Sequence, residues 1–273
     1  MTTKQDIDPN SVLLLPKSSR AFLVGMTGTG KSTLGEVLMN EYKKAYSHNK
    51  KKVRTLIVDT KPRWKAEREI NGLPTSLSGR YRKWGYGSGI IPNSYCLSGF
   101  TDRIEGELDQ ILRLGGEVAI AHAETEDEWP YVSQVATSFY ENYGSEFPRL
   151  LFVDEIGDFF KYRSLGDIFQ RVSRNGRERD VALIAGSQRP RKVPVEILTE
   201  MTRLYMFELD FKEDIARTMQ FGVPEDVKMP TGWSFYMYDR KMKRNPPSDG
   251  YYKLDLTNNI YTGEVYKREG DNQ

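Results

Sequence analysis

The sequence contains few of the residues that bind transition metals or form disulfides. Its 273 residues include one cysteine, Cys96, and two histidines, His48 and His122, which are far apart in the sequence. A single cysteine excludes an intramolecular disulfide, and these three residues do not support a metal site built from Cys and His ligands. We expect Cys96 to be a packed thiol.

Long apolar runs and a strong net charge are also missing. No segment approaches the roughly 18 apolar residues that a transmembrane helix needs. The apolar run at 12–15 ends at Pro16 and is too short for a secretory signal. We therefore expect no membrane span and a cytoplasmic location. The 40 basic residues nearly balance the 38 acidic ones, so contact with nucleic acid requires a local patch or the surface of an assembled ring.

The most informative motif is a phosphate loop. Residues 25–32 read Gly-Met-Thr-Gly-Thr-Gly-Lys-Ser, which is the complete G-x-x-x-x-G-K-[ST] pattern, between an apolar run at 21–24 and a helical segment at 33–39. In such a loop, backbone N–H groups surround phosphate oxygens and the helix N-terminus adds partial positive charge. We expect Lys31 to reach the β- and γ-phosphates of ATP and Ser32 to bind Mg²⁺. The predicted nucleotide contacts are Gly25, Met26, Thr27, Gly28, Thr29, Gly30, Lys31, Ser32 and Thr33.

A second motif supplies carboxylates. Residues 150–155 read Leu-Leu-Phe-Val-Asp-Glu, an apolar strand that ends in two acids. In a parallel sheet this strand brings both acids to the edge where the phosphate loop lies. We expect Asp154 to hold Mg²⁺ through its water shell and Glu155 to polarise the attacking water. Asp59, which ends an earlier apolar run, either assists the magnesium shell or caps a turn.

Two further groups are candidates for contact with the γ-phosphate. Gln188 follows the apolar run at 181–186, where a polar side chain is either a phosphate sensor or part of an ordinary turn. The segment 174–179 is rich in arginine, and Arg174 or Arg177 is a candidate arginine finger that acts on a neighbouring subunit. The alternative is a solvated helix end, where arginine suits the helix dipole.

The order of elements predicts an α/β fold. Apolar strands at 21–25, 55–59, 117–121, 150–155, 181–186 and 204–209 alternate with helices at 31–47, 126–143 and 164–175, which indicates a mostly parallel sheet with helices on both faces. We divide the chain into an N-terminal arm (1–20), an ATPase core (21–210) with an irregular insertion at about 71–100, and an appendage (211–273). The appendage is expected to contain a helix at 212–220 and strands at 233–238 and 251–254, a hairpin that closes one sheet edge.

Basic stretches at 50–54 and 61–68, with Arg80, Arg82 and Lys83, are candidates for contact with the DNA backbone. The alternative for each is a solvated surface.

Taken together, four segments resemble the FtsK/HerA family of P-loop ATPases. They read Leu-Val-Gly-Met-Thr-Gly-Thr-Gly-Lys-Ser at 23–32, Val-Asp-Thr-Lys at 58–61, Phe-Val-Asp-Glu at 152–155 and Ala-Gly-Ser-Gln-Arg-Pro at 185–190. The family comprises oligomeric motors that pump DNA. The resemblance implies a RecA-like core, ATP hydrolysis between subunits and an arginine given in trans. The compact size is similar to that of viral packaging ATPases or their mobile-element relatives, and a virus-encoded chain would act in the host cytoplasm.

The resulting expectation is an ATPase that translocates double-stranded DNA as a homo-oligomeric ring, a pentamer or hexamer, with capsid or portal-vertex proteins as candidate partners. One alternative is a terminase-type motor without its nuclease, since the acids after residue 210 show no metal-site grouping. Another is a small-molecule P-loop kinase or NTPase. A GTPase is disfavoured because Asn-Lys-Lys-Lys at 49–52 lacks the final Asp of the guanine motif.

Overall fold

The structure is a computed structural model. It describes residues 12–47, 51–60, 65–69, 90–97, 108, 117–122, 129–141, 146–160, 163–223, 229–240, 250–254 and 263–267. None of the helices in these ranges is long and apolar enough to cross a membrane.

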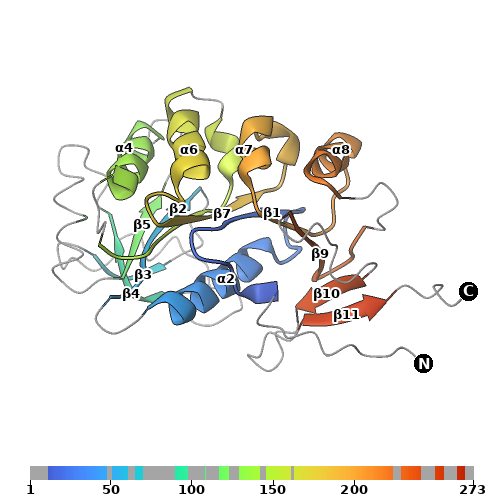
Figure 1. Cartoon of the computed structure of the whole chain (residues 1–273), viewed down its shortest axis with the longest axis horizontal. Coiled ribbons are helices and arrows are strands. Elements are labelled where there is room, and N and C mark those ends of the chain that lie inside the picture. Colours follow the sequence, from blue (N-terminus) through green and yellow to red (C-terminus); the bar gives the residue numbers. More distant parts are fainter. Residues whose placement is uncertain are drawn as a thin grey trace, which may run out of the picture.

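Within these ranges, eleven strands form one sheet in the order β11-β10-β9-β8-β1-β7-β6-β2-β5-β4-β3 (Figure 1). The strands are β1 (Arg20–Val24), β2 (Arg54–Asp59), β3 (Lys65–Glu69), β4 (Ile90–Cys96), β5 (Val118–His122), β6 (Arg149–Val153), β7 (Val181–Ser187), β8 (Arg203–Met206), β9 (Ser234–Asp239), β10 (Gly250–Leu254) and β11 (Gly263–Lys267). From β8 to β3 all neighbours are parallel. The last three strands run antiparallel at one edge. The predicted fold class, a mostly parallel sheet with a C-terminal hairpin-like edge, is confirmed.

Helices cover both faces of the sheet. Helix α2 (Lys31–Tyr46) lies on one face, and α4 (Trp129–Glu141), α6 (Arg163–Asn175), α7 (Val195–Glu200) and α8 (Lys212–Phe221) lie on the other (Figure 1). Helix α2 buries Leu34, Val37, Leu38 and Tyr42, whose spacing places them on one side of a 3.6-residue helix. Two apolar clusters result, one between the sheet and α2 and one between the sheet and the other helices.

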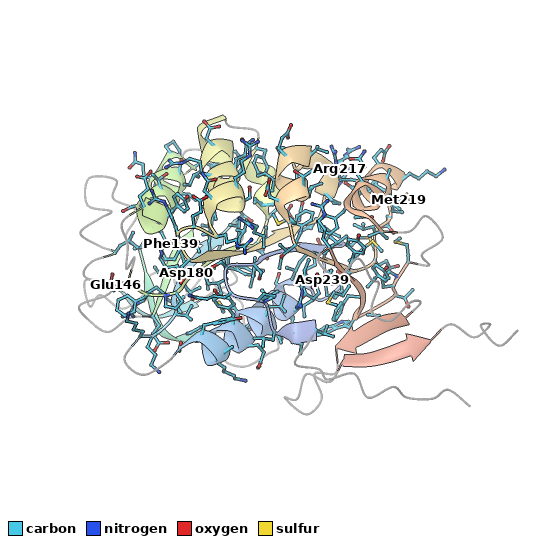
Figure 2. The ribbon with its side chains drawn as sticks, in the orientation of Figure 1. Phe139, Glu146, Asp180, Arg217, Met219 and Asp239 are labelled. Atoms are coloured by element: carbon cyan, nitrogen blue, oxygen red, sulfur yellow. The ribbon has the colours of Figure 1, made fainter. Side chains whose placement is uncertain are left out.

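Arg149, the first residue of β6, ties the second helical layer to the sheet. Its guanidinium is buried and donates hydrogen bonds to the carbonyl oxygens of Phe139 (2.8 Å) and Tyr140 (2.9 Å) near the end of α4. It also donates to the carbonyl oxygen of Arg179 (2.7 Å). Phe139 is labelled in Figure 2. Burial lowers the pKa of Arg149, and the three carbonyls compensate for the loss of water.

The predicted arm differs from the structure over residues 12–19. Val12, Leu13 and Leu15 are buried in the cluster beneath α2. The hydroxyl of Tyr205 donates to the carbonyl oxygen of Val12 (2.8 Å), and Arg203 donates to that of Leu14 (2.9 Å). This segment is therefore part of the core. Residues 1–11 of the predicted arm lie outside the described residues.

The expected irregular insertion also differs, because its last part is strand β4. This strand pairs in parallel with β5, and β3 pairs with β4 across a register shift. Pro92 and Asn93 are depleted in strands and hide the pattern from sequence reasoning. The rest of the expected insertion, 71–89 and 98–100, lies outside the described residues.

Candidate nucleotide-binding site

The phosphate loop connects β1 to α2 and contains two glycines whose backbone conformation other residues rarely adopt. Gly28 and Gly30 have φ angles of 84° and 104°, in the left-handed region that side chains disfavour. Gly30 is the N-cap of α2, so no side chain caps the first turn of the helix. The N–H groups of that turn are thus available to an anion at the helix N-terminus.

Lys31 lies inside the loop. Its side chain is buried, and Nζ donates hydrogen bonds to the carbonyl oxygens of Gly25 (2.6 Å) and Met26 (2.7 Å). These contacts hold the ammonium at the centre of the loop, where the sequence pattern expects the β- and γ-phosphates.

Ser32 and Asp154 come together across 122 positions of sequence. The hydroxyl of Ser32 donates to Oδ1 of Asp154 at 2.8 Å. Asp154 follows β6, and its N–H donates to the carbonyl oxygen of Val58, one residue before Asp59. Asp59 ends β2 and is fully buried. A hydroxyl and carboxylates at one strand edge form the hard oxygen set that Mg²⁺ prefers.

These oxygen ligands suit Mg²⁺ better than a metal whose ligands all come from the protein. Over the part of the chain that the structure describes, no three or more Asp, Glu, His or Cys residues gather as a metal site. Mg²⁺ characteristically uses one or two carboxylates and completes its shell with water and substrate phosphates. Ser32 and Asp154 fit that arrangement.

Glu155 is held by the end of the neighbouring strand. Its carboxylate accepts hydrogen bonds from the hydroxyl of Ser187 (2.6 Å) and from the N–H of Gln188 (2.8 Å to Oε2). Burial raises the pKa of Glu155 to about 7, and the nearby Asp158 adds to the rise. The hydrogen bonds from Ser187 and Gln188 and the charge of Lys31 act in the opposite direction on this pKa.

Gln188 joins this carboxylate to the loop. Its Oε1 accepts a hydrogen bond from the hydroxyl of Thr27 at 2.8 Å. Backbone hydrogen bonds also fix the loop on both sides: the N–H of Gly25 donates to the carbonyl oxygen of Ser187, and the N–H of Met26 donates to the carbonyl oxygen of Glu208. The predicted sensor residue therefore lies beside the phosphate loop.

Arg174 and Arg177 lie at the other edge of the sheet. The carbonyl oxygen of Arg174 accepts a hydrogen bond from the guanidinium of Arg20, the first residue of β1. Burial lowers the pKa of Arg20, and the positive charge of Arg177 contributes to this decrease. Both arginines are exposed. They precede the start of β7, whereas Gln188 follows its end. A strand of that length spans about 20 Å at roughly 3.3 Å per residue. Neither arginine reaches the phosphate loop of its own chain.

Two residues beside the site carry no local signal of their role. Ser187 stands in the motif at 185–190, and only the structure shows that its hydroxyl donates to Glu155. Asp214, at the start of α8, is one of the acids after residue 210 that form no recognisable group in the sequence, and it contacts the turn after Ser187 through Arg189. Only the fold brings α8 beside this turn, so no local pattern marks Asp214.

One DNA-contact candidate is corrected by the structure. Arg54 is buried, and its guanidinium stacks on the ring of Phe147 at 4.5 Å from the ring centre. Lys51 and Lys52 beside it are exposed. The remaining candidate positions lie where the structure describes no side chains.

No family model matches the sequence, and no curated protein matches it significantly. Among solved structures, the chain is similar to the genome packaging NTPase B204 from Sulfolobus turreted icosahedral virus 2 in complex with ATP-γS. The TM-score is 0.54 at 16% identity, over 84% of this chain and 96% of that chain. It is also similar to B204, the DNA-packaging ATPase from Sulfolobus Turreted Icosahedral Virus, with a TM-score of 0.53 at 15% identity over 84% and 96% of the two chains. At this identity the likeness shows the fold, a RecA-like P-loop NTPase.

Proposed function

We propose that the chain is an ATPase of the FtsK/HerA type that translocates double-stranded DNA, with genome packaging as its task. One observation carries the enzymatic part: Lys31, the Ser32–Asp154 pair and Glu155 meet at the carboxyl edge of the sheet. A phosphate anchor, a magnesium ligand pair and a buried base are the parts that hydrolysis of a nucleoside triphosphate requires.

In the proposed reaction, a water oxygen bonds to the γ-phosphorus of ATP as the bond from that phosphorus to the β,γ-bridging oxygen breaks. ADP takes the electron pair, and the water proton passes to Glu155 or to the released phosphate. Bound Mg²⁺ would supply charge neutralisation for the phosphate oxygens, held by Ser32 and by Asp154. The raised pKa of Glu155, about 7, suits a general base because it lies near the working pH.

The arrangement favours hydrolysis over transfer to a metabolite. In this proposal Glu155 orients the attacking water, and the support is that Ser187 and Gln188 fix its carboxylate beside the phosphate loop. A kinase instead needs an acceptor site. Gln188, linked to Thr27, would sense the γ-phosphate.

The motor part of the proposal has two supports. The first is the similarity of fold to B204, a genome packaging NTPase and DNA-packaging ATPase. The second is the position of Arg174 and Arg177 at the edge away from the phosphate loop. An arginine finger from that edge acts only on a neighbour, which requires a homo-oligomer; the proposed one is a ring of five or six subunits.

The test measures ATP hydrolysis with and without double-stranded DNA, together with particle mass. We expect DNA to stimulate turnover in a pentamer or hexamer. Lys31→Ala is the matched control: it should abolish hydrolysis and weaken ATP binding while leaving the circular dichroism spectrum unchanged. A monomer that ignores DNA but responds to a small metabolite would favour a kinase. Full turnover by Lys31→Ala would show that the nucleotide binds elsewhere.

A further inference from the structure

Asp214 is a buried carboxylate that the chemistry above does not use. It lies in the first turn of α8, and its side chain is 1% exposed. Its two oxygens contact two different residues of the turn that follows β7. Oδ2 accepts from Nε of Arg189 at 2.9 Å, and Oδ1 accepts from the backbone N–H of Arg191 at 3.0 Å.

An acid in the first turn of a helix is ordinarily explained by the helix dipole. Here that explanation is incomplete. Phe211 is the N-cap of α8, without a side-chain hydrogen bond, and both oxygens of Asp214 point to the turn at 188–191 instead. The guanidinium of Arg189 is further fixed by the ring of Phe211, 4.1 Å from the ring centre.

The same turn holds Glu155 from its other side. The backbone N–H of Arg189 donates to the hydroxyl oxygen of Ser187 at 3.1 Å, and this hydroxyl donates to Glu155 at 2.6 Å. The N–H of Gln188 donates directly to Glu155. Asp214 is thus two residues removed from the carboxylate, through Arg189 and Ser187.

We propose that Asp214 is a positioning residue for ATP hydrolysis, which fixes the turn at 187–191 and thereby orients Glu155. The inference rests on the proposed ATPase function. Neither Asp214 nor Arg189 contacts the phosphate loop in the interactions described above. The turn that they fix does contact it, through the carbonyl oxygen of Ser187 and the side chain of Gln188, whereas Lys31 is held by carbonyl oxygens of the loop itself and Ser32 by Asp154. Loss of the pair should therefore displace the water-polarising group more than the groups that hold ATP.

The test compares Asp214→Asn with a matched control, Asp239→Asn. The asparagine at 214 keeps the shape of the side chain and can still accept from Arg191, but it loses the ion pair with Arg189. Asp239 lies on β9 (Figure 2) and pairs at 2.7 Å with Arg203, at the start of β8 and away from the loop. Both carboxylates are buried, but Arg203 is 5% exposed and Arg189 is 29% exposed, so the control breaks the more deeply buried pair. The control therefore breaks a similar ion pair without reaching Glu155.

We expect Asp214→Asn to lower kcat roughly 10- to 100-fold, as a misplaced catalytic group does, with the Kd for ATP-γS unchanged within about twofold. Arg189→Met should lower kcat similarly, and the double variant no further, because the two residues act as a unit. Asp239→Asn should leave kcat unchanged below its unfolding temperature. Equal kcat losses at 214 and 239, or a loss of ATP-γS affinity that accounts for the effect, would overturn the proposal.

A second measurement needs no turnover, so it separates this inference from the proposed function. The urea unfolding midpoints of Asp214→Asn, Glu155→Gln and their double variant should be non-additive, since the residues share a hydrogen-bonded turn. Those of Asp239→Asn and Glu155→Gln should add. If the wild-type chain hydrolyses no ATP yet the first pair is non-additive, the ATPase proposal fails and the positioning link stands. Additive midpoints for the first pair would refute the link.

Discussion

Glu155→Gln should make the protein more stable while it inactivates the enzyme. The carboxylate is buried, and its pKa is raised from 4.5 to about 7. Between these values the folded state binds more protons than the unfolded state, so stability falls as pH rises through the window. At 1.36 kcal/mol per unit, the shift of 7 − 4.5 = 2.5 units corresponds to about 3 kcal/mol above pH 7.

Glutamine removes this cost and keeps the hydrogen bonds. Its amide oxygen can accept from the N–H of Gln188, and its NH₂ group can donate to the hydroxyl of Ser187, which accepts as well as donates. Without nucleotide or Mg²⁺, we expect the variant to unfold roughly 6–12 °C above wild type at pH 8. At pH 5 the difference should shrink to about a quarter of that value, because Glu155 is then protonated in most folded wild-type molecules.

The assay is thermal unfolding followed by circular dichroism at pH 5, 6, 7 and 8. Glu178→Gln is the control, since the side chain of Glu178 is exposed in the turn before β7. The melting temperatures of this variant and of wild type should shift equally with pH. ATPase turnover of Glu155→Gln should fall roughly 10²-fold or more, with ATP still bound. A variant that is no more stable than wild type at pH 8, or whose advantage is independent of pH, would refute the raised pKa.

Two further predictions concern the arginines. Whichever of Arg174→Ala and Arg177→Ala removes the finger should lower turnover about 10³-fold or more. Mixing that variant with Lys31→Ala subunits should restore part of the activity, because the Lys31→Ala subunits still supply the arginine. Full activity of a monomer at every concentration would rule out a shared site. Arg149→Met should lower the free energy of unfolding by on the order of 3 kcal/mol, because two buried carbonyls and one part-buried carbonyl lose their donor. Denaturant unfolding measures this, and a loss below about 1 kcal/mol would mean that water replaces the guanidinium.

The central part of the fold could be predicted because local patterns and topology agree there. A buried parallel strand is a short apolar run, and each of β1, β2, β6 and β7 is buried along its whole length. The phosphate loop is a local motif whose glycines and lysine are contiguous. The same reasoning missed β3, whose five residues read Lys-Ala-Glu-Arg-Glu, and β11. Neither run has the apolar alternation that marks a strand.

The site could be predicted only as far as its motifs extend. Lys31, Ser32, Asp154, Glu155 and Gln188 stand in recognisable patterns, and the fold gathers them at one edge. The partners that orient them depend on tertiary structure. Asp214 reaches the turn at 187–191 only because α8 packs beside η4 (Pro190–Lys192), and no spacing in the sequence indicates this contact.

If the chain forms the proposed oligomer, the polarity of the sheet constrains how its subunits meet. Parallel strands place the phosphate loop, Asp154 and Glu155 at the carboxyl edge and the exposed arginines before β7 at the amino edge. An arginine from one subunit reaches the phosphate of another only if the amino edge of the first faces the carboxyl edge of the second. Such a contact joins two different surfaces, and repeated head-to-tail contacts close into a ring when the rotation between subunits closes. A symmetric dimer that pairs two carboxyl edges would instead leave both sites without an arginine. If either arginine is the finger, a closed head-to-tail ring therefore provides one complete site at every interface.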